Sequence, residues 1–178
     1  MSQAPGNGLT GMETTNLDIY GHDALEWSRV ADALTASRGP DVTFFLGTVR
    51  PEGGPHAAGI GALWVDETIW FVTGPDTRKA RNLAGNPACT LSARLPGIDV
   101  VLEGRAERIA DAGTLEQLAA AYREAGWPAQ VDGDAFTAPY SAPSAGPPPW
   151  HLYRFTHGTA FAVATAEPYG ATRWRFAA

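Results

Sequence analysis

The chain has 178 residues, 44% of them hydrophobic, and this length fits a single globular domain with a sizeable core. The formal net charge of −6 argues against a nucleic-acid backbone or an anionic membrane as the main partner, because both attract basic proteins. No apolar stretch approaches the roughly 20 residues that span a bilayer. The N-terminus also lacks the basic and apolar regions of a secretion signal, so we expect a cytoplasmic protein.

The chain is predicted to begin with a loose arm and a helix. Residues 1–21 mix glycine, asparagine, threonine and proline without periodicity, so the folded domain is expected to cover residues 22–178. Between Asp23 and Ser37 apolar residues recur at helical spacing. The Gly39-Pro40 pair ends that helix.

A series of short strands follows. We predict strands over residues 42–49, 56–65, 68–73, 89–93, 100–109, 152–156 and 159–165, with turns between most of them. Asp111 is predicted to cap a helix over residues 112–125. Short strands joined by turns indicate a mainly β domain with flanking helices, built as a closed antiparallel barrel. A parallel sheet would need a crossover helix after most strands.

Residues 126–150 are rich in proline and glycine and show no period. A segment of this length without structure is uncommon inside a compact domain. Two interpretations remain open at this point. The segment is either a lid over a substrate pocket or a disordered surface insertion, and its aromatic residues are Trp127, Phe136, Tyr140 and Trp150.

One lysine stands out among thirteen basic residues, because Lys79 is the only lysine of the chain. It follows an apolar strand and a Gly-Pro-Asp turn, and Thr77 is the predicted N-cap of the short helix that begins there. The free N–H groups and the dipole of a helix N-terminus attract anions. The sequence therefore predicts an anion site at this helix, with Thr77, Arg78, Lys79 and Arg81 around it.

The helical phase orders these basic side chains. At about 100° per residue, Lys79 and Arg81 flank an apolar stripe on opposite sides, and Arg78 points most nearly away from it. The stripe consists of Ala80, Leu83 and Ala84. Lys79 is therefore the first choice for a phosphate contact at the buried edge of the helix.

No other group of residues suggests a catalytic or metal site. The four histidines have no metal-ligand spacing among themselves or with Cys89, the single cysteine. Cys89 lies in an alternating apolar run and is interpreted as a packed core thiol. His56, at the start of a strand, is interpreted as a hydrogen-bonded structural residue. No metal site is predicted, and the catalytic residues stay unknown.

The stretch from Phe71 to Ala80, continuing to Asn86-Pro87, resembles the pyridoxamine 5′-phosphate oxidase-like family. In those split barrels a Ser/Thr-Arg-Lys-Ala run after a strand holds the phosphate of FMN. Residues 101–109 are similar to a later strand of the family, and the stretch from Thr48 to His56 is similar to its first hairpin. The resemblance covers about residues 40–125. It implies an antiparallel split β-barrel and a homodimer with the cofactor at the subunit interface.

The resemblance also assigns roles to individual residues. It implies that Arg78 and Lys79 bind the phosphate, and that Val72 and Thr73 contact the flavin from the preceding strand. The ending at residues 171–176 is similar to a branch of the family that uses the deazaflavin coenzyme F420. Trp174 in this ending is expected either to pack on a ring in the partner subunit or to close the barrel.

Two departures from the family pattern bear on the substrate. The oxidase proper has basic residues at positions that correspond to Ala58 and Leu63 here, and residues 159–165 contain nothing similar to its substrate motif. Pyridoxamine phosphate is therefore not the expected substrate. A strand of small residues without this basic clamp is again similar to the branch that uses coenzyme F420.

Three functions follow from the resemblance. The first is an oxidoreductase that binds FMN or coenzyme F420 and transfers a hydride to or from a small organic substrate. The second is a non-catalytic module that binds a flavin or haem. The third is a flavin reductase that serves another enzyme.

Overall fold

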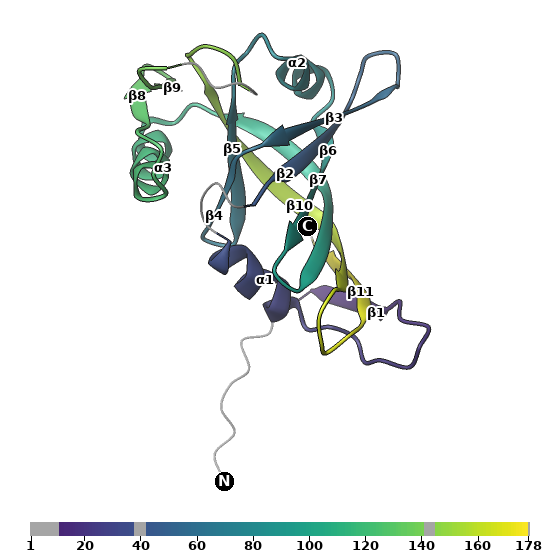
Figure 1. Ribbon diagram of the computed structural model, residues 1–178. Coiled ribbons are helices and arrows are strands. Elements are labelled where there is room, and N and C mark those ends of the chain that lie inside the picture. The colour runs from purple at the N-terminus through teal and green to yellow at the C-terminus, as the bar shows by residue number, and fades with distance from the viewer. Residues whose placement is uncertain (1–10, 38–41, 141–144, 178) are drawn as a thin grey trace.

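A computed structural model describes residues 11–37, 42–140 and 145–177, and Figure 1 shows its elements. The helices are α1 (Trp27–Ala36), α2 (Arg78–Gly85) and α3 (Ala112–Glu124). The strands are β1 (Met12–Asn16), β2 (Phe44–Val49), β3 (Pro55–Ile60), β4 (Ala62–Val65), β5 (Thr68–Thr73), β6 (Ala88–Leu95), β7 (Ile98–Ile109), β8 (Gln130–Asp132), β9 (Ala135–Thr137), β10 (His151–Ala164) and β11 (Ala171–Phe176). The described chain is mainly β, as predicted. None of these helices combines the length and the apolar character that a membrane span requires.

The strands form an antiparallel split barrel. The pairs β10–β7, β7–β6, β6–β2 and β2–β3 follow one another on one side. On the other side β10 pairs with β5, and β5 pairs with β4. The chain runs from β3 into β4 through Gly61. Because β3 pairs with β2 and β4 pairs with β5, the ring of hydrogen-bonded strands stays open between β3 and β5 among the described residues. The antiparallel split barrel that the family resemblance implies is confirmed. The closed barrel expected from the strand pattern alone was wrong, because no pairing among the described strands joins β3 to β5.

The prediction of one strand over residues 56–65 was wrong, because the chain forms β3 and β4 there. β3 pairs with β2, whereas β4 pairs with β5, so the chain changes partners at Gly61. Glycine permits the sharp bend that such a corner needs. The turn at Asp66-Glu67 is confirmed, with positive φ angles of 50° and 56° that suit a two-residue hairpin.

The main core fills the inside of the barrel. Burial alternates along β2 and β6, as expected for strands that have one face on the core and one outside. Leu46, Phe71 and Phe155 are almost completely buried. Each such side chain contributes about 1.5–3 kcal/mol through the removal of apolar surface from water.

The N-terminal prediction needs two corrections. Residues 12–16 are no loose arm, because they form β1, which pairs with β11 in the register Met12↔Phe176. This partner lies at the far end of the chain, and local periodicity carries no sign of it. The first helix begins at Trp27 instead of Asp23. The predicted stop at Gly39-Pro40 lies outside the described residues.

The last two predicted strands are a single strand, β10, with an irregularity in its register between His157 and Thr159. β7 approaches β10 closely beside this irregularity. A Cβ atom on Gly104 would lie 2.1 Å from the carbonyl oxygen of Thr156 and 2.9 Å from Cα of His157. Only a residue without a side chain fits this position.

We therefore expect Gly104→Ala to lower the free energy of unfolding by about 1–3 kcal/mol, the usual cost of forcing atoms into a packed site. Urea or thermal unfolding measures the loss. Gly158→Ala is the matched control, because a Cβ atom there would meet nothing within 4 Å. Equal unfolding midpoints for the two variants would contradict the close approach of β7 and β10.

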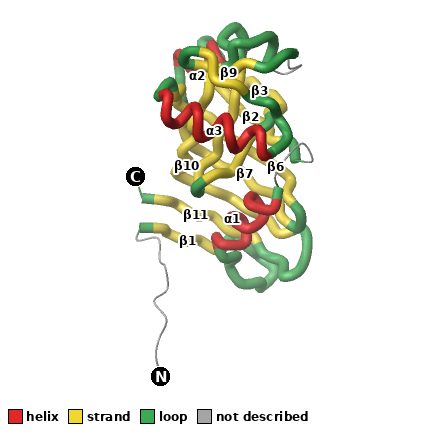
Figure 2. The backbone as a smooth tube through the Cα atoms, turned by 90° about the vertical axis from the view of Figure 1, so that its left-hand side faces the viewer, coloured by secondary structure: helices red, strands yellow, loops and turns green. Residues whose placement is uncertain are grey.

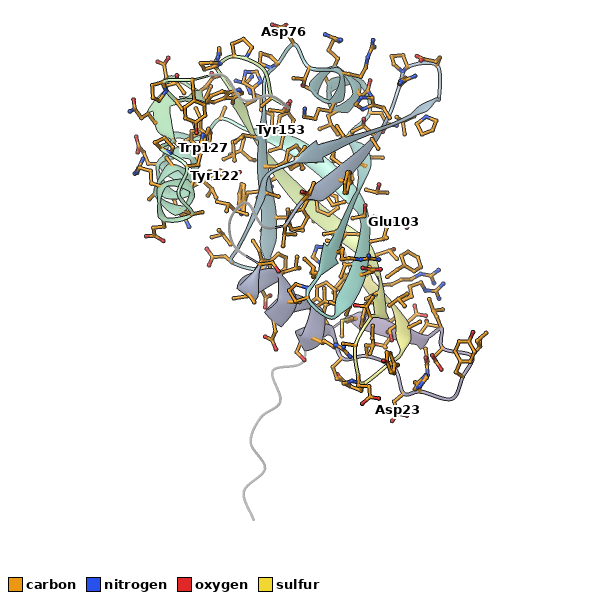
Figure 3. All side chains as sticks on the ribbon, in the orientation of Figure 1. Asp23, Asp76, Glu103, Tyr122, Trp127 and Tyr153 are labelled. Carbon is orange, nitrogen blue, oxygen red and sulfur yellow. The ribbon has the colours of Figure 1, made fainter. Side chains whose placement is uncertain are left out.

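The described part of the segment 126–150, residues 126–140 and 145–150, packs against α3 and contributes to a second core. Figure 3 shows Tyr122 of α3 next to Trp127, and their ring centroids are 5.0 Å apart. The hairpin of β8 and β9 adds Phe136, which is completely buried and bridges to Trp150. Over its described part, residues 126–140 and 145–150, the segment is ordered, so the alternative of a disordered insertion was wrong there.

The helices take different positions around the barrel. α2 packs against β2 and β3 at one end of the strands (Figure 1). Figure 2 shows α3 lying across the strands and α1 beside the end that carries β1 and β11. The Asp111 carboxylate caps α3, as predicted, because it accepts hydrogen bonds from the amides of Gly113 and Thr114. Hydrogen bonding lowers the pKa of Asp111, with the largest effect from the Thr114 side chain and smaller effects from the amides of Thr114 and Gly113.

Candidate functional site

The start of α2 is held by two threonine hydroxyl groups. The predicted N-cap is confirmed, because Thr77 Oγ1 accepts a hydrogen bond of 3.3 Å from the amide of Ala80. The Thr77 hydroxyl donates to the carbonyl oxygen of Gly74 at 2.9 Å. Thr73 Oγ1, at 2.9 Å, is then the donor to Thr77 Oγ1. The turn before α2 is thereby tied to the end of β5.

The basic residues of α2 differ in burial. Lys79 is 4% exposed, whereas Arg78 and Arg81 are exposed. An Arg81 Nη atom donates to the carbonyl oxygen of Asp76 at 2.5 Å, so Arg81 closes the turn before the helix. Among the predicted phosphate contacts, Lys79 is therefore the one that lies against the body of the barrel.

The apolar stripe of α2 was predicted with one wrong member. Ala84 is exposed, and the polar residue Asn82 is buried in its place, with 2% of its surface exposed. Asn82 lies three residues after Lys79, so both side chains share the face that α2 turns toward β2 and β3. The three-residue spacing from Lys79 could have indicated that Asn82 is buried. The composition of the helix, however, gave no reason to prefer Asn82 over its other polar residues.

Asn82 connects α2, through Thr48, to His56, which was interpreted from the sequence as a structural residue. Asn82 Nδ2 donates to Thr48 Oγ1 of β2 at 2.9 Å. Thr48 Oγ1 lies 3.4 Å from His56 Nδ1 of β3. The Oδ1 atom of Asn82 is buried without a hydrogen-bond partner among the described residues. Three elements thus bring polar side chains together beside Lys79.

The electrostatics of this group favour an anion. Burial lowers the pKa of the Lys79 ammonium, because a charged group loses its hydration there. Burial also lowers the pKa of His56, and the positive charges of Arg50, Lys79 and Arg78 lower it further. A negative ligand at this position offsets the cost of confining several cations near one another.

The split of the barrel lies beside the start of α2. The pairing of β4 with β5 ends at Ala62↔Phe71. Within the described parts of the chain, no strand therefore pairs with Val72 and Thr73 on that side. The side chain of Val72 packs against the small core of Ala138, Ala145 and Trp150, and Thr73 is completely buried. Val72 and Thr73 thus form an unpaired backbone edge beside the start of α2.

The insertion reaches the same turn. The amide of Gly74 donates to the carbonyl oxygen of Ala145 at 3.0 Å. A Cβ atom on Gly74 would lie 2.3 Å from that oxygen, so the approach needs glycine. The ordered part of the segment 126–150 therefore supports the turn that leads into α2.

A hollow of about 620 Å³ opens next to this group. Its lining includes His56 from β3, Cys89 from β6 and Glu103 from β7. Burial raises the pKa of the Cys89 thiol to about 12. The thiol therefore stays protonated at neutral pH, which confirms the interpretation of Cys89 as a packed core residue.

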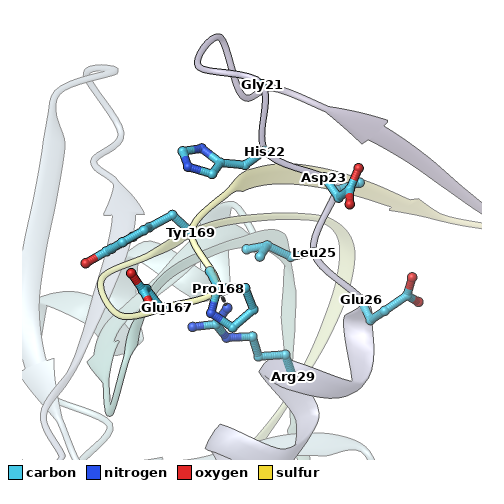
Figure 4. Close-up of a pocket in the computed structure, with 10 residues that line it drawn as sticks. Gly21, His22, Asp23, Leu25, Glu26, Arg29, Glu167, Pro168 and Tyr169 are labelled. Atoms are coloured by element: carbon cyan, nitrogen blue, oxygen red, sulfur yellow. Dashed lines mark hydrogen bonds between the residues drawn. The ribbon is translucent and has the colours of Figure 1, made fainter.

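A larger hollow, of about 900 Å³, lies elsewhere (Figure 4). Its lining residue Asp23 is at the opposite end of the molecule from Asp76, the residue before Thr77 (Figure 3). The Arg29 guanidinium in its floor donates to the carbonyl oxygens of Gly97, Ala166 and Pro168. Because this cation is already hydrogen-bonded and the rim is acidic, the hollow does not suit a phosphate.

Trp174 does not join the predicted cofactor-binding residues. It is completely buried within its own chain, and its ring centroid lies 5.4 Å from that of Trp27. The alternative prediction, an aromatic residue that closes the barrel, describes this position. Its ring partner Trp27 comes from α1, so the place of Trp174 in the core could not be predicted from residues 171–176 alone.

The described residues contain no group of three or more histidine, cysteine or acidic side chains that could hold a metal ion. The fold and the site define a split-barrel protein in which the threonine-capped helix α2 begins beside the open edge of the barrel, at the place where the sequence predicts an anion site. A buried lysine, a helix N-terminus and an unpaired strand edge fit the phosphate and the ring of a flavin-type cofactor.

Comparison with known proteins identifies the family. The sequence profile described as pyridoxamine 5′-phosphate oxidase matches residues 32–156, which is more than half of the chain. The chain therefore belongs to the pyridoxamine 5′-phosphate oxidase family of flavin-related split barrels, as the resemblance of its motifs predicted.

Solved structures share the fold at low sequence identity. A conserved hypothetical protein from Mycobacterium tuberculosis has a TM-score of 0.60 and 20% identity, over 81% of this chain and 88% of that one. PhzG from Burkholderia lata has a TM-score of 0.55 and 16% identity, over 83% and 81%. A NimC/NimA family protein from Clostridium acetobutylicum has a TM-score of 0.54 and 14% identity, over 81% and 91%. No curated protein matches the chain.

Proposed function

We propose that this protein is an oxidoreductase that binds FMN or coenzyme F420 and transfers a hydride to or from a small organic substrate. The observation that carries the proposal is Lys79, a buried lysine at the start of a threonine-capped helix beside an open strand edge. Lys79 and the first amides of α2 would hold the phosphate, with Arg78 and Arg81 at the rim. The backbone of Val72 and Thr73 would lie along the ring.

In this proposal the bound cofactor supplies the hydride chemistry, and the protein supplies binding and orientation. Because the cofactor itself carries the hydride, the reaction needs no catalytic dyad of side chains, and no such dyad is recognisable in the sequence. Pyridoxamine phosphate is not the proposed substrate. The β10 residues Thr159–Ala164 carry no basic side chain that would bind its phosphate, and they lie between β7 and β11 in the sheet.

We also propose that the protein acts as a homodimer in the cytoplasm. Phe45, Val101 and Val163 are 52%, 41% and 54% exposed on the outer face of β2, β7 and β10. The register Phe45↔Ser92↔Val101 places the first two in one row. The hollow of about 620 Å³ adjoins that row. A second copy seated on this face would cover exposed apolar surface and enclose the hollow.

A cofactor-retention experiment tests the proposal. The pure protein is mixed with FMN or with coenzyme F420, desalted, and examined by absorption spectroscopy and by light scattering. We expect a bound cofactor at one per protomer and the mass of a dimer, because each dimer would contain two complete sites. Retention of neither cofactor would contradict the proposed function, and a monomer that retains cofactor would contradict only the dimer.

A second function is a non-catalytic module that binds a flavin or haem. Ala58 and Leu63 favour it, because they stand where the oxidase proper has basic residues, and Leu63 is packed in the second core. Steady turnover of a reduced flavin or deazaflavin by the pure protein would exclude this alternative. Retained cofactor without turnover of any tested acceptor would favour it.

A further inference from the structure

We propose that His56 is a third basic group of the anion site, beside Lys79 and Arg78, and that it gains a proton from solvent when a dianion binds. This inference rests on the proposed function, since it concerns the group that would hold the cofactor phosphate. It gives His56 a binding role and makes the affinity of the site depend on pH near neutrality.

The position of His56 in β3 directs its side chain to the site. The outward residues Pro55 and Ala57 of this strand are exposed, whereas His56, Ala58 and Ile60 are more buried and share the inner face, which α2 covers. Of these three residues, His56 is the one with a polar side chain. The register Thr48↔His56 places it directly opposite a buried hydroxyl group on β2.

The hydrogen bonds of Thr48 orient the imidazole. Asn82 Nδ2 is a donor, so Thr48 Oγ1 accepts from it at 2.9 Å, and the hydroxyl proton of Thr48 remains for another acceptor. Both His56 Nδ1 and the carbonyl oxygen of His56 lie 3.4 Å from Thr48 Oγ1. When Nδ1 accepts this proton, Nε2 carries the ring N–H and is available as a donor. The chain of contacts thus connects His56 to the same helix face as Lys79.

The charges around His56 explain why a ligand would change its protonation. Burial lowers the pKa of His56 most, and the charges of Arg50, Lys79 and Arg78 add to this effect, so the free imidazole is neutral at pH 7. Cys89 of β6 lines the adjoining hollow with a neutral thiol, and Glu103 of β7 lines it with a carboxylate. A dianion beside these cations reverses the sign of the local potential, which favours the imidazolium. His56 is partly exposed, so a ligand and solvent protons can reach it.

Sulfate is the sharpest probe of this inference, because it stays a dianion from pH 6 to pH 8, whereas a phosphate monoester titrates at about pH 6. Isothermal titration of the full chain with sulfate should show affinity rising as the pH falls, on the order of tenfold across this range, since each unit of pKa shift on binding corresponds to a tenfold change in affinity. Titration in buffers of different ionisation enthalpy should show proton uptake. This second measurement needs no variant.

The substitution His56→Gln keeps a hydrogen-bonding side chain but cannot take a proton. We expect sulfate and FMN to bind this variant more weakly at pH 6, with an affinity for sulfate that no longer depends on pH. His22→Gln is the matched control, because His22 lies at the far end of the molecule beside Asp18. It should retain the pH dependence of the unsubstituted protein.

The outcomes separate this inference from the proposed function. Cofactor binding that prefers FMN to riboflavin, combined with sulfate affinity that is flat with pH or unchanged in His56→Gln, would overturn the role of His56 and leave the proposed function intact. Failure of the unsubstituted protein to bind sulfate, FMN or coenzyme F420 would overturn both. Proton uptake in the unsubstituted protein that disappears in His56→Gln would support the inference.

Discussion

Replacing Lys79 with alanine is expected to weaken the binding of FMN or coenzyme F420 by about 10- to 150-fold. This range corresponds to the roughly 1.5–3 kcal/mol that a hydrogen bond to a charged group contributes. The effect should be near the upper end because Lys79 is buried, with 4% of its surface exposed, and solvent screens its charge little. Fluorescence or absorption titrations of the purified variant with each cofactor measure the change.

Riboflavin separates the phosphate contact from the rest of the site. It carries the ring of FMN but no phosphate, so its affinity should be nearly the same with Lys79 and with alanine at this position. Arg94→Ala controls for the loss of one positive charge, because the exposed Arg94 side chain pairs with Asp99 across the hairpin of β6 and β7. Unchanged affinity of Lys79→Ala for both cofactors would remove Lys79 from the proposed site.

Replacing Trp174 with alanine is expected to lower the free energy of unfolding by about 3–5 kcal/mol, the usual cost of deleting a large aromatic side chain from a core. For a protein of this size such a loss lowers the melting temperature by roughly 6–20 °C. Trp174 is completely buried, and its ring packs edge to face against Trp27, which also contacts Phe176. Thermal unfolding at a fixed protein concentration measures the effect, because dimerisation would make the midpoint depend on concentration.

The same variant distinguishes the two predictions made for Trp174. If Trp174 closes the barrel, its removal should lower the free energy of unfolding more than it lowers the cofactor affinity. Trp174→Phe should then recover most of the lost free energy of unfolding, because it restores an aromatic ring. A residue that packs on a cofactor in the partner subunit would instead change cofactor affinity with little effect on unfolding. The second result would contradict the position of Trp174 in the core of its own chain.

Local signals in the sequence were sufficient for most elements near the site. Thr77 reads as a cap because its hydroxyl can satisfy a free amide of the next turn, and the structure contains that bond. The Asp66-Glu67 turn and the Asp111 cap are similar cases, since each depends on residues adjacent in the chain. The family resemblance also rested on continuous stretches of sequence, and the profile match confirms it.

Contacts between distant parts of the chain could not be predicted in this way. β1 pairs with β11, which lies near the opposite end of the sequence, and no local pattern in either strand indicates this pairing. The break at Gly61 follows from the different partners of β3 and β4. The group of Asn82, Thr48 and His56 is assembled from three elements, so His56 read on its own suggested only a structural residue.

The burial of Lys79 has a practical consequence for chemical labelling. Because the chain contains no other lysine, a reagent that acylates ε-amino groups has one target side chain, and it lies at the proposed binding site. A lowered pKa leaves more of this amine unprotonated and nucleophilic, whereas burial restricts its access to solvent. The extent of acylation, read by mass spectrometry, thus reports the occupancy of one defined place in the molecule.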